Sequence, residues 1–397
     1  MKQEPKYKQT EIGLIPQDWR VLSLDETTEI NKESRDPSNK PETPFLYIDI
    51  ESVENESGNI KNVKNLIGKK APSRARRVIH ENDVIMSTVR PYLKAFAIIE
   101  KRYENQICST GFAVLTSKDK LHPKFLLYSL FTKGVINQCT KMMTGGQYPA
   151  LNSSQVARIN IPLPPILEQK SISEVLSTVD ARLNIVERES QRIERLKVGL
   201  MKELFDGKKW TAVKLGDEKF FEMIMGQSPP SELYNRDGIG LPFLQGNAEF
   251  GDLYPSPTIY CSKTMKVAKT GDILISVRAP VGEVNIANVD YCIGRGVGAI
   301  RARKDVDSQF LFFYLKSINS KLDSISGGST FKAITKNQLE KLEVFLPPLD
   351  EQKRISLILS TIDKKLSIQK SQKSKLESIK KSLMNDLLTG KKRVKVD

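Results

Sequence analysis

Two copies of the triplet Glu-Gln-Lys offer the most direct sign of chemistry in this sequence. They lie at residues 168–170 and 351–353. An acid and a lysine two residues apart form half of a common nuclease metal site, which also needs an Asp on a neighbouring strand so that two carboxylates can share Mg²⁺. The strand expected before the first copy, "ARINIPL", contains no acid. Both glutamates instead follow a Pro-Pro pair, where a carboxylate stabilises the first turn of a helix.

No other catalytic pattern is complete. The two histidines, His80 and His122, are too few and too isolated for a metal site or a nucleophile-base pair. A GxxxxGK[ST] phosphate loop is absent, and "GRGVGAI" at 294–300 lacks the dinucleotide-binding spacing. "QSPPS" at 227–231 lacks the Asn or Asp and the aromatic residue that flank Pro-Pro in methyltransferases of base amines. We therefore predict no catalytic residue, no metal site and no cofactor in this chain.

Composition indicates a soluble protein with a polyanionic partner. The 397 residues carry 62 Lys and Arg against 47 Asp and Glu, a net charge of +15. Such a balance favours binding to phosphates, because neutralising them releases counterions, although a merely basic surface is the alternative. No apolar run approaches the roughly 20 residues of a membrane span, and no signal peptide opens the chain. We expect a cytoplasmic protein of two to three domains whose four scattered cysteines are reduced structural thiols.

The Glu-Gln-Lys triplets belong to a longer duplicated phrase. "LPPILEQKSISEVLSTVD" at 163–180 and "LPPLDEQKRISLILSTID" at 346–363 are identical at 12 of 18 positions. At the same offset, "LMKELFDGKK" at 200–209 matches "LMNDLLTGKK" at 383–392. "NDVIMSTVRP" at 82–91 resembles "GDILISVRAP" at 271–280, and the only two tryptophans, Trp19 and Trp210, also correspond. The whole chain is therefore two copies of one unit.

Each copy predicts a mixed α/β globule followed by a long helix. Short apolar runs such as "AFAIIE" and "GFAVLTS" are typical of strands, and one helix is expected within residues 122–142 and another within 307–326. Apolar residues at alternating spacings of three and four follow each Pro-Pro pair and predict helices with a coiled-coil seam, interrupted in the second copy by Gln369 and Lys373. Glycines at 207 and 390 suit their C-terminal caps.

The predicted fold class is α+β, with two mixed α/β globules, each followed by a long helix, and with the two helices packing as an antiparallel coiled coil with a pseudo-twofold repeat. The predicted domains are globule 1 at 1–165, helix 1 at 166–207, globule 2 at 208–348 and helix 2 at 349–393. Each helix of about 40 residues is roughly 60 Å long. The first helical segment carries seven basic and eight acidic residues, and the segment 349–397 carries thirteen and six. This contrast favours pairing of the two unlike helices within one chain.

Several basic residues are candidates for contacts with nucleic acid. The stretch 61–77, "KNVKNLIGKKAPSRARR", holds seven basic residues and no acid, and is expected to be either a phosphate-contacting loop or a solvated flexible one. Its candidate ligands are Lys69, Lys70, Arg74, Arg76 and Arg77. Arg90 and Arg278 each end a predicted strand, where an arginine can bind a guanine edge, a phosphate or a structural carboxylate.

Two Gly-Gly loops, "TGGQYPAL" at 144–151 and "SGGSTFKAI" at 326–334, combine closely approaching backbone with an aromatic residue. Such a loop can direct N–H groups to phosphates and stack a ring on bases, or it can be an ordinary turn with the ring packed inward. The candidate residues are Gly145, Gly146, Gln147, Tyr148, Gly327, Gly328, Thr330, Phe331 and Lys332.

The whole chain resembles the specificity subunit of Type I restriction-modification systems. The resemblance rests on "IPLPPILEQKSISEVLSTVD", "VFLPPLDEQKRISLILSTID", "GQSPPSELYN", "IPQDW" at 15–19 and the two Gly-Gly loops. It implies that each globule is a target recognition domain that reads one half of a bipartite double-stranded DNA site. The first copy departs from the pattern, because "NKESRDPS" stands where the second copy has "GQSPPS". Gln227 and Ser228 of the second copy are the DNA-binding candidates at this turn.

The resemblance also implies partners. The helices are expected to set the spacing between half-sites and to dock two modification (methyltransferase) subunits, which restriction subunits join. S-adenosylmethionine is then expected on the methyltransferase, and ATP and Mg²⁺ on the restriction subunit. The residues implied in docking are Pro164, Pro165, Glu168, Gln169, Pro347, Pro348, Glu351 and Gln352. Two other functions remain open: a coiled-coil adaptor with no DNA role, and a nuclease that uses the acids of the Glu-Gln-Lys triplets.

Overall fold

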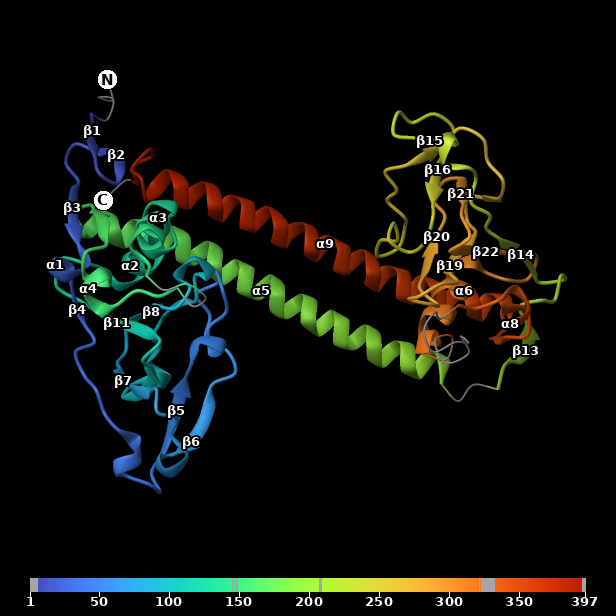
Figure 1. Cartoon of the computed structure of the whole chain (residues 1–397). Coiled ribbons are helices and arrows are strands. Elements are labelled where there is room, and N and C mark those ends of the chain that lie inside the picture. Colours follow the sequence, from blue (N-terminus) through green and yellow to red (C-terminus); the bar gives the residue numbers. More distant parts are fainter. Residues whose placement is uncertain are drawn as a thin grey trace. The chain divides into compact units, whose positions relative to one another are not determined.

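The computed structural model describes residues 6–144, 146, 149–206, 209–320, 322 and 333–394 (Figure 1). The chain forms two compact units: unit 1 comprises Met1–Val186 and Gln372–Asp397, and unit 2 comprises Glu187–Ser371. Each unit contains one globule and a part of both long helices, α5 (Ile166–Phe205) and α9 (Leu349–Leu387). The domain boundaries at 165, 207 and 348 remain a prediction, since the compact units divide within the helices. No helix in the described ranges is long and apolar enough to cross a membrane.

Two four-stranded sheets form the frame of unit 1. The first has the spatial order β6 (Lys64–Ile67), β5 (Pro44–Ile48), β10 (Gln106–Ser109) and β7 (Ala75–Ile79). The second has the order β4 (Thr28–Ile30), β11 (Phe112–Ser117), β8 (Val84–Ser87) and β9 (Phe96–Ile98). Within these sheets only the β5–β10 pair is parallel. Figure 1 shows β5 and β6 side by side in the blue part of the chain.

The second sheet of unit 1 is buried on both faces. All four residues of β8 are buried, and successive side chains of a strand point to opposite faces. Val84 and Met86 therefore join the core beneath the helices, whereas Ile85 joins a separate core against the first sheet. β19 (Ile273–Ser276) of unit 2 repeats this pattern, with Ile273 in one core and Leu274 in the other. A continuous apolar run between turns is the sequence form that such a strand requires.

The helices of unit 1 cover one face of this sheet. The single helix expected within 122–142 is instead two, α2 (Pro123–Leu130) and α3 (Lys133–Met142). The break has a local cause, because the Thr132 side chain accepts a hydrogen bond from the backbone N–H of Val135 and so starts a new helix. The other elements are α1 (Leu24–Thr27), α4 (Ser153–Ala157), the hairpin β1 (Tyr7–Thr10) and β2 (Gly13–Pro16), and the antiparallel pair β3 (Arg20–Ser23) and β12 (Asn160–Leu163).

Unit 2 repeats this plan. One sheet has the order β14 (Phe221–Met225), β22 (Val297–Ala302), β19 (Ile273–Ser276) and β20 (Val284–Ile286). The other has the order β15 (Tyr234–Asn235), β17 (Tyr260–Cys261), β16 (Leu241–Leu244), β21 (Tyr291–Ile293) and β18 (Val267–Ala268). The antiparallel pair β13 (Thr211–Lys214) and β23 (Glu343–Leu346) corresponds to β3 and β12, and the helices are α6 (Ser308–Ser317) and α8 (Lys336–Glu340). The duplication found in the sequence is therefore a duplication of the fold.

Short 3-10 helices complete the described connections. They are η1 (Pro37–Asn39), η2 (Ile50–Ser52), η3 (Gly68–Lys70), η4 (Pro91–Leu93), η5 (Lys101–Tyr103) and η6 (Ser231–Leu233).

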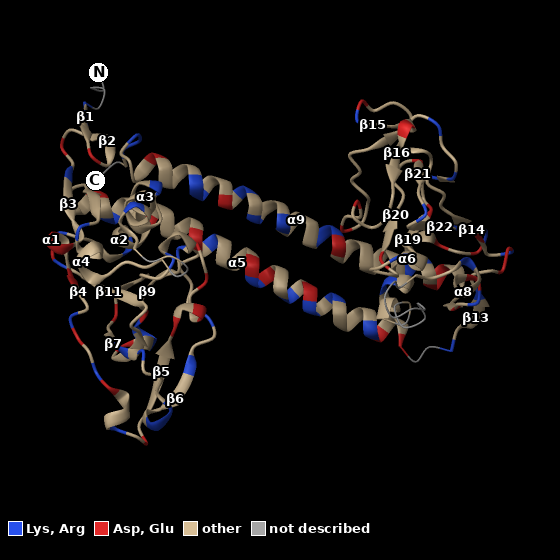
Figure 2. Cartoon of the chain, in the orientation of Figure 1, with Lys and Arg blue, Asp and Glu red and all other residues tan. Residues whose placement is uncertain are grey.

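The two long helices begin directly after the Pro-Pro pairs, and their residues meet within each unit. In unit 1, Lys380 of α9 forms an ion pair of 2.6 Å with Asp180 of α5. In unit 2, Lys197 pairs with Asp363, and Gln369 donates a hydrogen bond of 2.9 Å to Glu189. Figure 2 shows acidic and basic residues interspersed along both helices. Gln369, one of the two residues expected to interrupt the seam, is thus buried and hydrogen-bonded, and the coiled-coil seam itself remains a prediction.

All four cysteines are buried and unpaired. Burial raises the pKa of Cys139 to about 12 and that of Cys292 to about 11, so their thiols stay protonated and unreactive at neutral pH.

His80 of unit 1 lies between two carboxylates. Its Nδ1 is 2.7 Å from Oε1 of Glu104, and its Nε2 is 3.0 Å from Oε2 of Glu33. Because both ring nitrogens face acceptors, the doubly protonated ring is stabilised. The hydrogen bond to Glu104 is the largest cause of the raised pKa of His80. The other histidine, His122, has a lowered pKa because burial disfavours its charged form.

These opposite shifts give unit 1 a testable pH dependence. A histidine whose pKa is higher in the folded state stabilises the fold below its ordinary pKa, and this contribution is lost as pH rises through the folded value. We expect His80→Gln to flatten the fall in melting temperature between about pH 6 and about pH 8. His122→Gln is the matched control and should steepen that fall, since a lowered pKa has the opposite sign. Calorimetry of the three proteins at several pH values checks this. Equal slopes for wild type and His80→Gln would contradict the role of His80.

Candidate nucleic-acid interface and helix junctions

A glycine-flanked turn, residues 294–296, connects β21 to β22 in unit 2. Gly294 N–H donates to the carbonyl of Leu244 at 2.8 Å, and Gly296 N–H donates to the carbonyl of Gln245 at 3.1 Å. A Cβ on Gly296 would lie 2.4 Å from that same oxygen, so only glycine allows this approach. Gly296 thus serves close backbone packing, and Arg295 is exposed at the tip of the turn.

Exposed polar side chains gather around this turn. Ser228 accepts a hydrogen bond of 3.2 Å from the backbone N–H of Arg295 and donates one of 3.1 Å to the side chain of Gln245. Gln227, the residue before Ser228, is exposed, as is Gln245. Amide side chains suit adenine and guanidinium groups suit guanine in the major groove. Gln227 and Ser228 are predicted site residues, whereas Gln245 and Arg295 were missed. The sequence shows only an arginine between two glycines there, and the exposure of Arg295 comes from the folded turn.

Arg278 lies beside this turn. Val277 N–H donates to the carbonyl of Gly296 at 3.0 Å, and Arg278 forms a β-bridge with Ala333. The structure therefore brings together the exposed Arg278, the arginine turn and the segment that follows the second Gly-Gly loop. The loop residues predicted there, Gly327, Gly328, Thr330, Phe331 and Lys332, lie outside the described residues.

Unit 1 has the same framework with different side chains. Thr88 N–H donates to the carbonyl of Gly111 at 2.8 Å, as Val277 does to Gly296 in unit 2. The residue at the tip of the unit 1 turn is Thr110, which is exposed and donates its N–H to the carbonyl of Arg74 at 2.8 Å. Arginine at the tip in one unit and threonine in the other give two different surfaces on one scaffold.

The β-bridges to Ala150 and Ala333 show that Arg90 and Arg278 do not occupy equivalent positions. Ala150 pairs with Val89, so Val89 and not Arg90 occupies the position of Arg278. Arg90 is one residue further on, in a left-handed conformation with a φ of 48°, and donates its N–H to the carbonyl of Pro149 at 3.0 Å. It still lies beside the segment that follows the first Gly-Gly loop. Gly146 of that loop has open space at its Cβ position, and Gly145, Gln147 and Tyr148 lie outside the described residues.

The basic stretch 61–77 is not the loop that was expected. It forms β6, η3 and the start of β7, and four of its seven cations meet acids from other segments. These ion pairs are Lys61–Glu54, Lys64–Asp49, Lys69–Glu42 and Arg76–Asp36. Burial lowers the pKa of Arg77, whose Nε has no hydrogen-bond partner among the described residues. Within the described part of the chain, Lys70 and Arg74 are therefore the exposed cations of this stretch that form no ion pair.

Each long helix is joined to its globule by a buried glutamine side chain. Oε1 of Gln169 accepts from the N–H of His122 at 2.8 Å, and Nε2 donates to the carbonyls of Lys120 and Pro164 at 2.9 and 2.8 Å. In unit 2, Gln352 repeats this pattern. Its Oε1 accepts from Asp307 N–H at 2.9 Å, and its Nε2 donates to the carbonyls of Asp305 and Pro347 at 3.1 and 2.9 Å. We call these two arrangements the glutamine clamps.

The clamps correct part of the docking prediction. Gln169 and Gln352 are 0% and 1% exposed, so their side chains hold the helix to the globule and present no surface to a partner. Pro164 and Pro347 are buried as well, whereas Pro165 and Pro348 are exposed. Docking by the exposed residues stays a prediction.

The corresponding glutamates have different environments. Glu168 is buried; it accepts from Nε1 of Trp19 at 3.1 Å and from Nε of Arg393 at 2.5 Å. Arg393 also pairs with Asp18 at 2.8 Å and lies over the Trp19 ring, so the C-terminal tail covers this helix start. Glu351 is exposed and has no counterpart of Arg393 in the described ranges. The Glu168 carboxylate is thus fully used within unit 1, which argues against the nuclease hypothesis.

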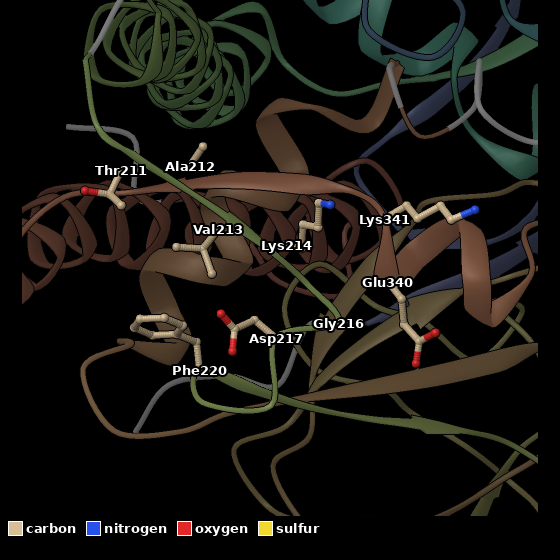
Figure 3. Close-up of a pocket in the computed structure, with 9 residues that line it drawn as sticks. All are labelled: Thr211, Ala212, Val213, Lys214, Gly216, Asp217, Phe220, Glu340 and Lys341. Carbon is tan, nitrogen blue, oxygen red and sulfur yellow. The ribbon is translucent and has the colours of Figure 1, made fainter.

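A cavity of about 690 Å³ lies along β13 in unit 2 (Figure 3). Its polar lining includes Lys214, Asp217, Glu340 and Lys341. The carboxylates of Asp217 and Glu340 point in different directions in Figure 3. In the described part of the chain no three His, Cys, Asp or Glu side chains gather as metal ligands. The cavity therefore offers no paired acids for metal chemistry.

The protein is thus built from two repeated globules, each joined to a long helix and each with a different polar turn. The family model for the Type I restriction modification DNA specificity domain matches residues 16–195 and 207–378. The chain belongs to this family, whose specificity subunits are not enzymes.

Individual relatives match this chain over nearly its whole length. A putative type I restriction enzyme MjaX specificity subunit of Methanocaldococcus jannaschii is 38% identical and covers 99% of this chain and 98% of its own length. One solved structure comes from work on complex assembly and conformational transition of the type I R-M system. It is 38% identical to this chain with a TM-score of 0.59, and the match covers 95% of this chain and 99% of that one. The S subunit from M. genitalium, at 18% identity and a TM-score of 0.66 over 96% of this chain and 98% of its own, shares the fold.

The contact between Arg393 and Glu168 predicts a difference between the two helix starts. Arg393→Ala leaves the buried Glu168 carboxylate without its cation, so we expect a loss of about 2–4 kcal/mol in the free energy of unfolding of unit 1. Glu351→Ala removes an exposed carboxylate at the equivalent position and should change stability by less than about 0.5 kcal/mol. Urea titration of both variants measures this. Equal effects of the two substitutions would show that the buried pair does not stabilise unit 1.

Proposed function

We propose that this chain is the DNA-recognition subunit of a Type I restriction-modification complex, and that each globule reads one half of a bipartite site. The observation that carries the proposal is the pair of equivalent turns. The backbone hydrogen bond from Thr88 to Gly111 matches that from Val277 to Gly296, yet the tip residues are Thr110 and Arg295. One scaffold with two different sets of base-reading side chains suits two different half-sites.

The charge of the chain supports a DNA partner. A net charge of +15 attracts the phosphate backbone and makes affinity fall with salt. Arg278, Arg295, Lys70 and Arg74 are exposed, and the last two form no ion pair among the described residues. Phosphate contacts orient the protein on the duplex, and base contacts then select the sequence. An adaptor without a DNA role would not need some side chains for phosphates and others for bases.

The long helices are proposed to set the half-site spacing, to pack as an antiparallel coiled coil and to dock two methyltransferase subunits. The ion pairs Asp180–Lys380 and Asp363–Lys197 support such packing. The exposed residues next to the clamps, among them Pro165 and Pro348, are candidates for docking. S-adenosylmethionine then belongs to the methyltransferase, and ATP and Mg²⁺ belong to the restriction subunits that complete the complex. Relatives named as restriction enzyme subunits support this assembly, which would act in the cytoplasm.

The proposal is tested by exchanging one globule. Residues 208–348 are replaced by the equivalent segment of a relative, and both chains are expressed with the same methyltransferase subunit in a host without other methylation. Methylome sequencing should show a bipartite motif in which one half changes and the other half and the spacer are kept. A motif that changes in both halves, or a single continuous motif, would show that the globules do not read separate half-sites.

Arg295 is expected to contribute base selectivity. In the assembled complex, Arg295→Ala should reduce discrimination at one base pair of one half-site by about 1–3 kcal/mol, because a bidentate contact to guanine is lost. The matched control is Lys70→Ala, which should weaken binding to all sequences alike and lower the salt slope by about 1. Both effects are measured on a library of half-site variants at fixed salt. If Arg295→Ala weakens all sequences equally, Arg295 contacts phosphate and not a base.

A further inference from the structure

The glutamine clamps join each long helix to the scaffold of its globule through main-chain atoms. All three partners of each amide are backbone groups, so the geometry does not depend on the identity of the neighbouring side chains. The N–H that each Gln Oε1 accepts belongs to the residue directly before α2 or α6. Those helices carry Phe125 and Phe310, both 0% exposed, at the centre of the two main cores. The first turn of each long helix is thus fixed to the start of a core helix and to the exposed loop residue, Lys120 or Asp305, that precedes it.

Only glutamine satisfies this site. It must accept one hydrogen bond and donate two from the same side chain. Glutamate has no N–H to give and would bring a charge into a fully buried position, and an apolar residue would leave one N–H and two carbonyls unpaired. The presence of this residue at the same position in both units points to a shared mechanical requirement.

A second contact fixes each helix further along. In unit 1 the Asp180–Lys380 ion pair lies at the Tyr128 ring of α2, with Lys380 Nζ 6.0 Å from the ring centre and the Tyr128 hydroxyl donating to Asp180 at 2.7 Å. In unit 2 the Asp363–Lys197 pair lies at the Phe313 ring of α6, with Lys197 Nζ 5.8 Å from its centre. Asp180 and Asp363 are each eleven residues after the clamp glutamine, about 16 Å along the helix. Two attachments at that separation resist rocking of the helix on its globule.

We propose that Gln169 and Gln352 are positioning residues that hold each globule at a fixed angle to the long helices, and that this angle sets how strictly the half-site spacing is selected. The inference rests on the proposed function. A globule of about 150 residues has a radius of about 20 Å. A rotation of about 10° at the junction would therefore move its outer surface by about 3.5 Å, close to the ~3.4 Å rise of one base pair. A loose junction would accept a spacer one base pair longer or shorter.

The test uses the complete chain assembled with its methyltransferase subunit. The double variant Gln169→Met with Gln352→Met keeps side-chain length and removes all three hydrogen bonds at each junction. The matched control is Lys170→Met with Lys353→Met, at the exposed neighbouring positions. Methylation rates are measured on duplexes that share both half-sites and differ only in spacer length, by one base pair in each direction.

Wild type and the lysine control should prefer one spacer length. In the glutamine variant the preference for that length should fall about tenfold, while the half-site sequences stay the same. Equally strict spacing in the folded variant would overturn the proposal, as would a loss of half-site selectivity at unchanged spacing. If the wild-type complex recognises no bipartite site at all, the proposed function fails instead, so the two failures are distinguishable.

A measurement on the wild-type chain covers the case in which the methionine variant does not fold. Hydrogen exchange at the amides of His122 and Asp307, the two N–H groups that the clamps accept, should be as slow as exchange within α2 and α6. Exchange at the rate of an exposed loop would mean that the clamps are open in solution, and the proposal would be wrong. Gln169→Asn alone, one methylene shorter, is the milder variant for the spacer assay.

Discussion

The fold of each unit depends on how a helix of some forty residues is held at its start. Near its start each long helix buries apolar side chains in the core of its globule, Ile172 and Leu176 in α5 and Ile355 and Leu359 in α9. In both units a buried amide adds hydrogen bonds to three backbone groups. Hydrogen bonds are directional where apolar contacts are not, so this arrangement specifies an angle as well as an attachment. The Pro-Pro pair before it ends the strand and leaves a carbonyl for the amide to bond.

The two units show how equal sequences acquire unequal environments. Glu168 and Glu351 occupy the same position of the repeated phrase, but among the described residues Arg393 pairs with Glu168 and no such pair forms at Glu351. Arg393 and Trp19 enclose Glu168, and Gly390, with a φ of 70°, lets the tail pass within contact of Pro16. Any partner that binds near these glutamates therefore meets a neutralised pair in unit 1 and an open carboxylate in unit 2. The two units therefore share their framework but differ in their surface chemistry.

The proposed recognition surfaces follow the same logic. The framework feature shared by both units is one turn glycine, Gly111 or Gly296, with the backbone bond that its carbonyl accepts. The side chains at the tips of the turns differ, and these are the ones that a duplex could read. A stable scaffold can accept new tip residues without loss of stability because those residues take no part in the cores. Under the proposed function, this separation lets one fold carry two different reading surfaces within one chain.

Much of this architecture was predictable from the sequence. The duplication, the strand runs, the two long helices and their starts after Pro-Pro follow from local patterns, because periodicity and proline act over a few residues. The family resemblance rested on the same repeated phrase. The structure alone decided the roles of individual residues, since these depend on partners far away in the chain. Gln169 was predicted to dock a partner, but its bonds to Lys120 and His122 place it inside.

The basic stretch 61–77 contains no acid, yet Asp36, Glu42, Asp49 and Glu54 neutralise four of its cations across the sheet. Arg295 offered no motif, and its prominence comes from two glycines packed against another strand. The Glu-Gln-Lys triplet at 168–170 shows the effect of local sequence and the effect of tertiary contacts. Its position at a helix start was determined by the prolines before it, whereas the use of its glutamate and glutamine as internal bonding groups was decided by tertiary contacts, because burial and partners are properties of the folded chain.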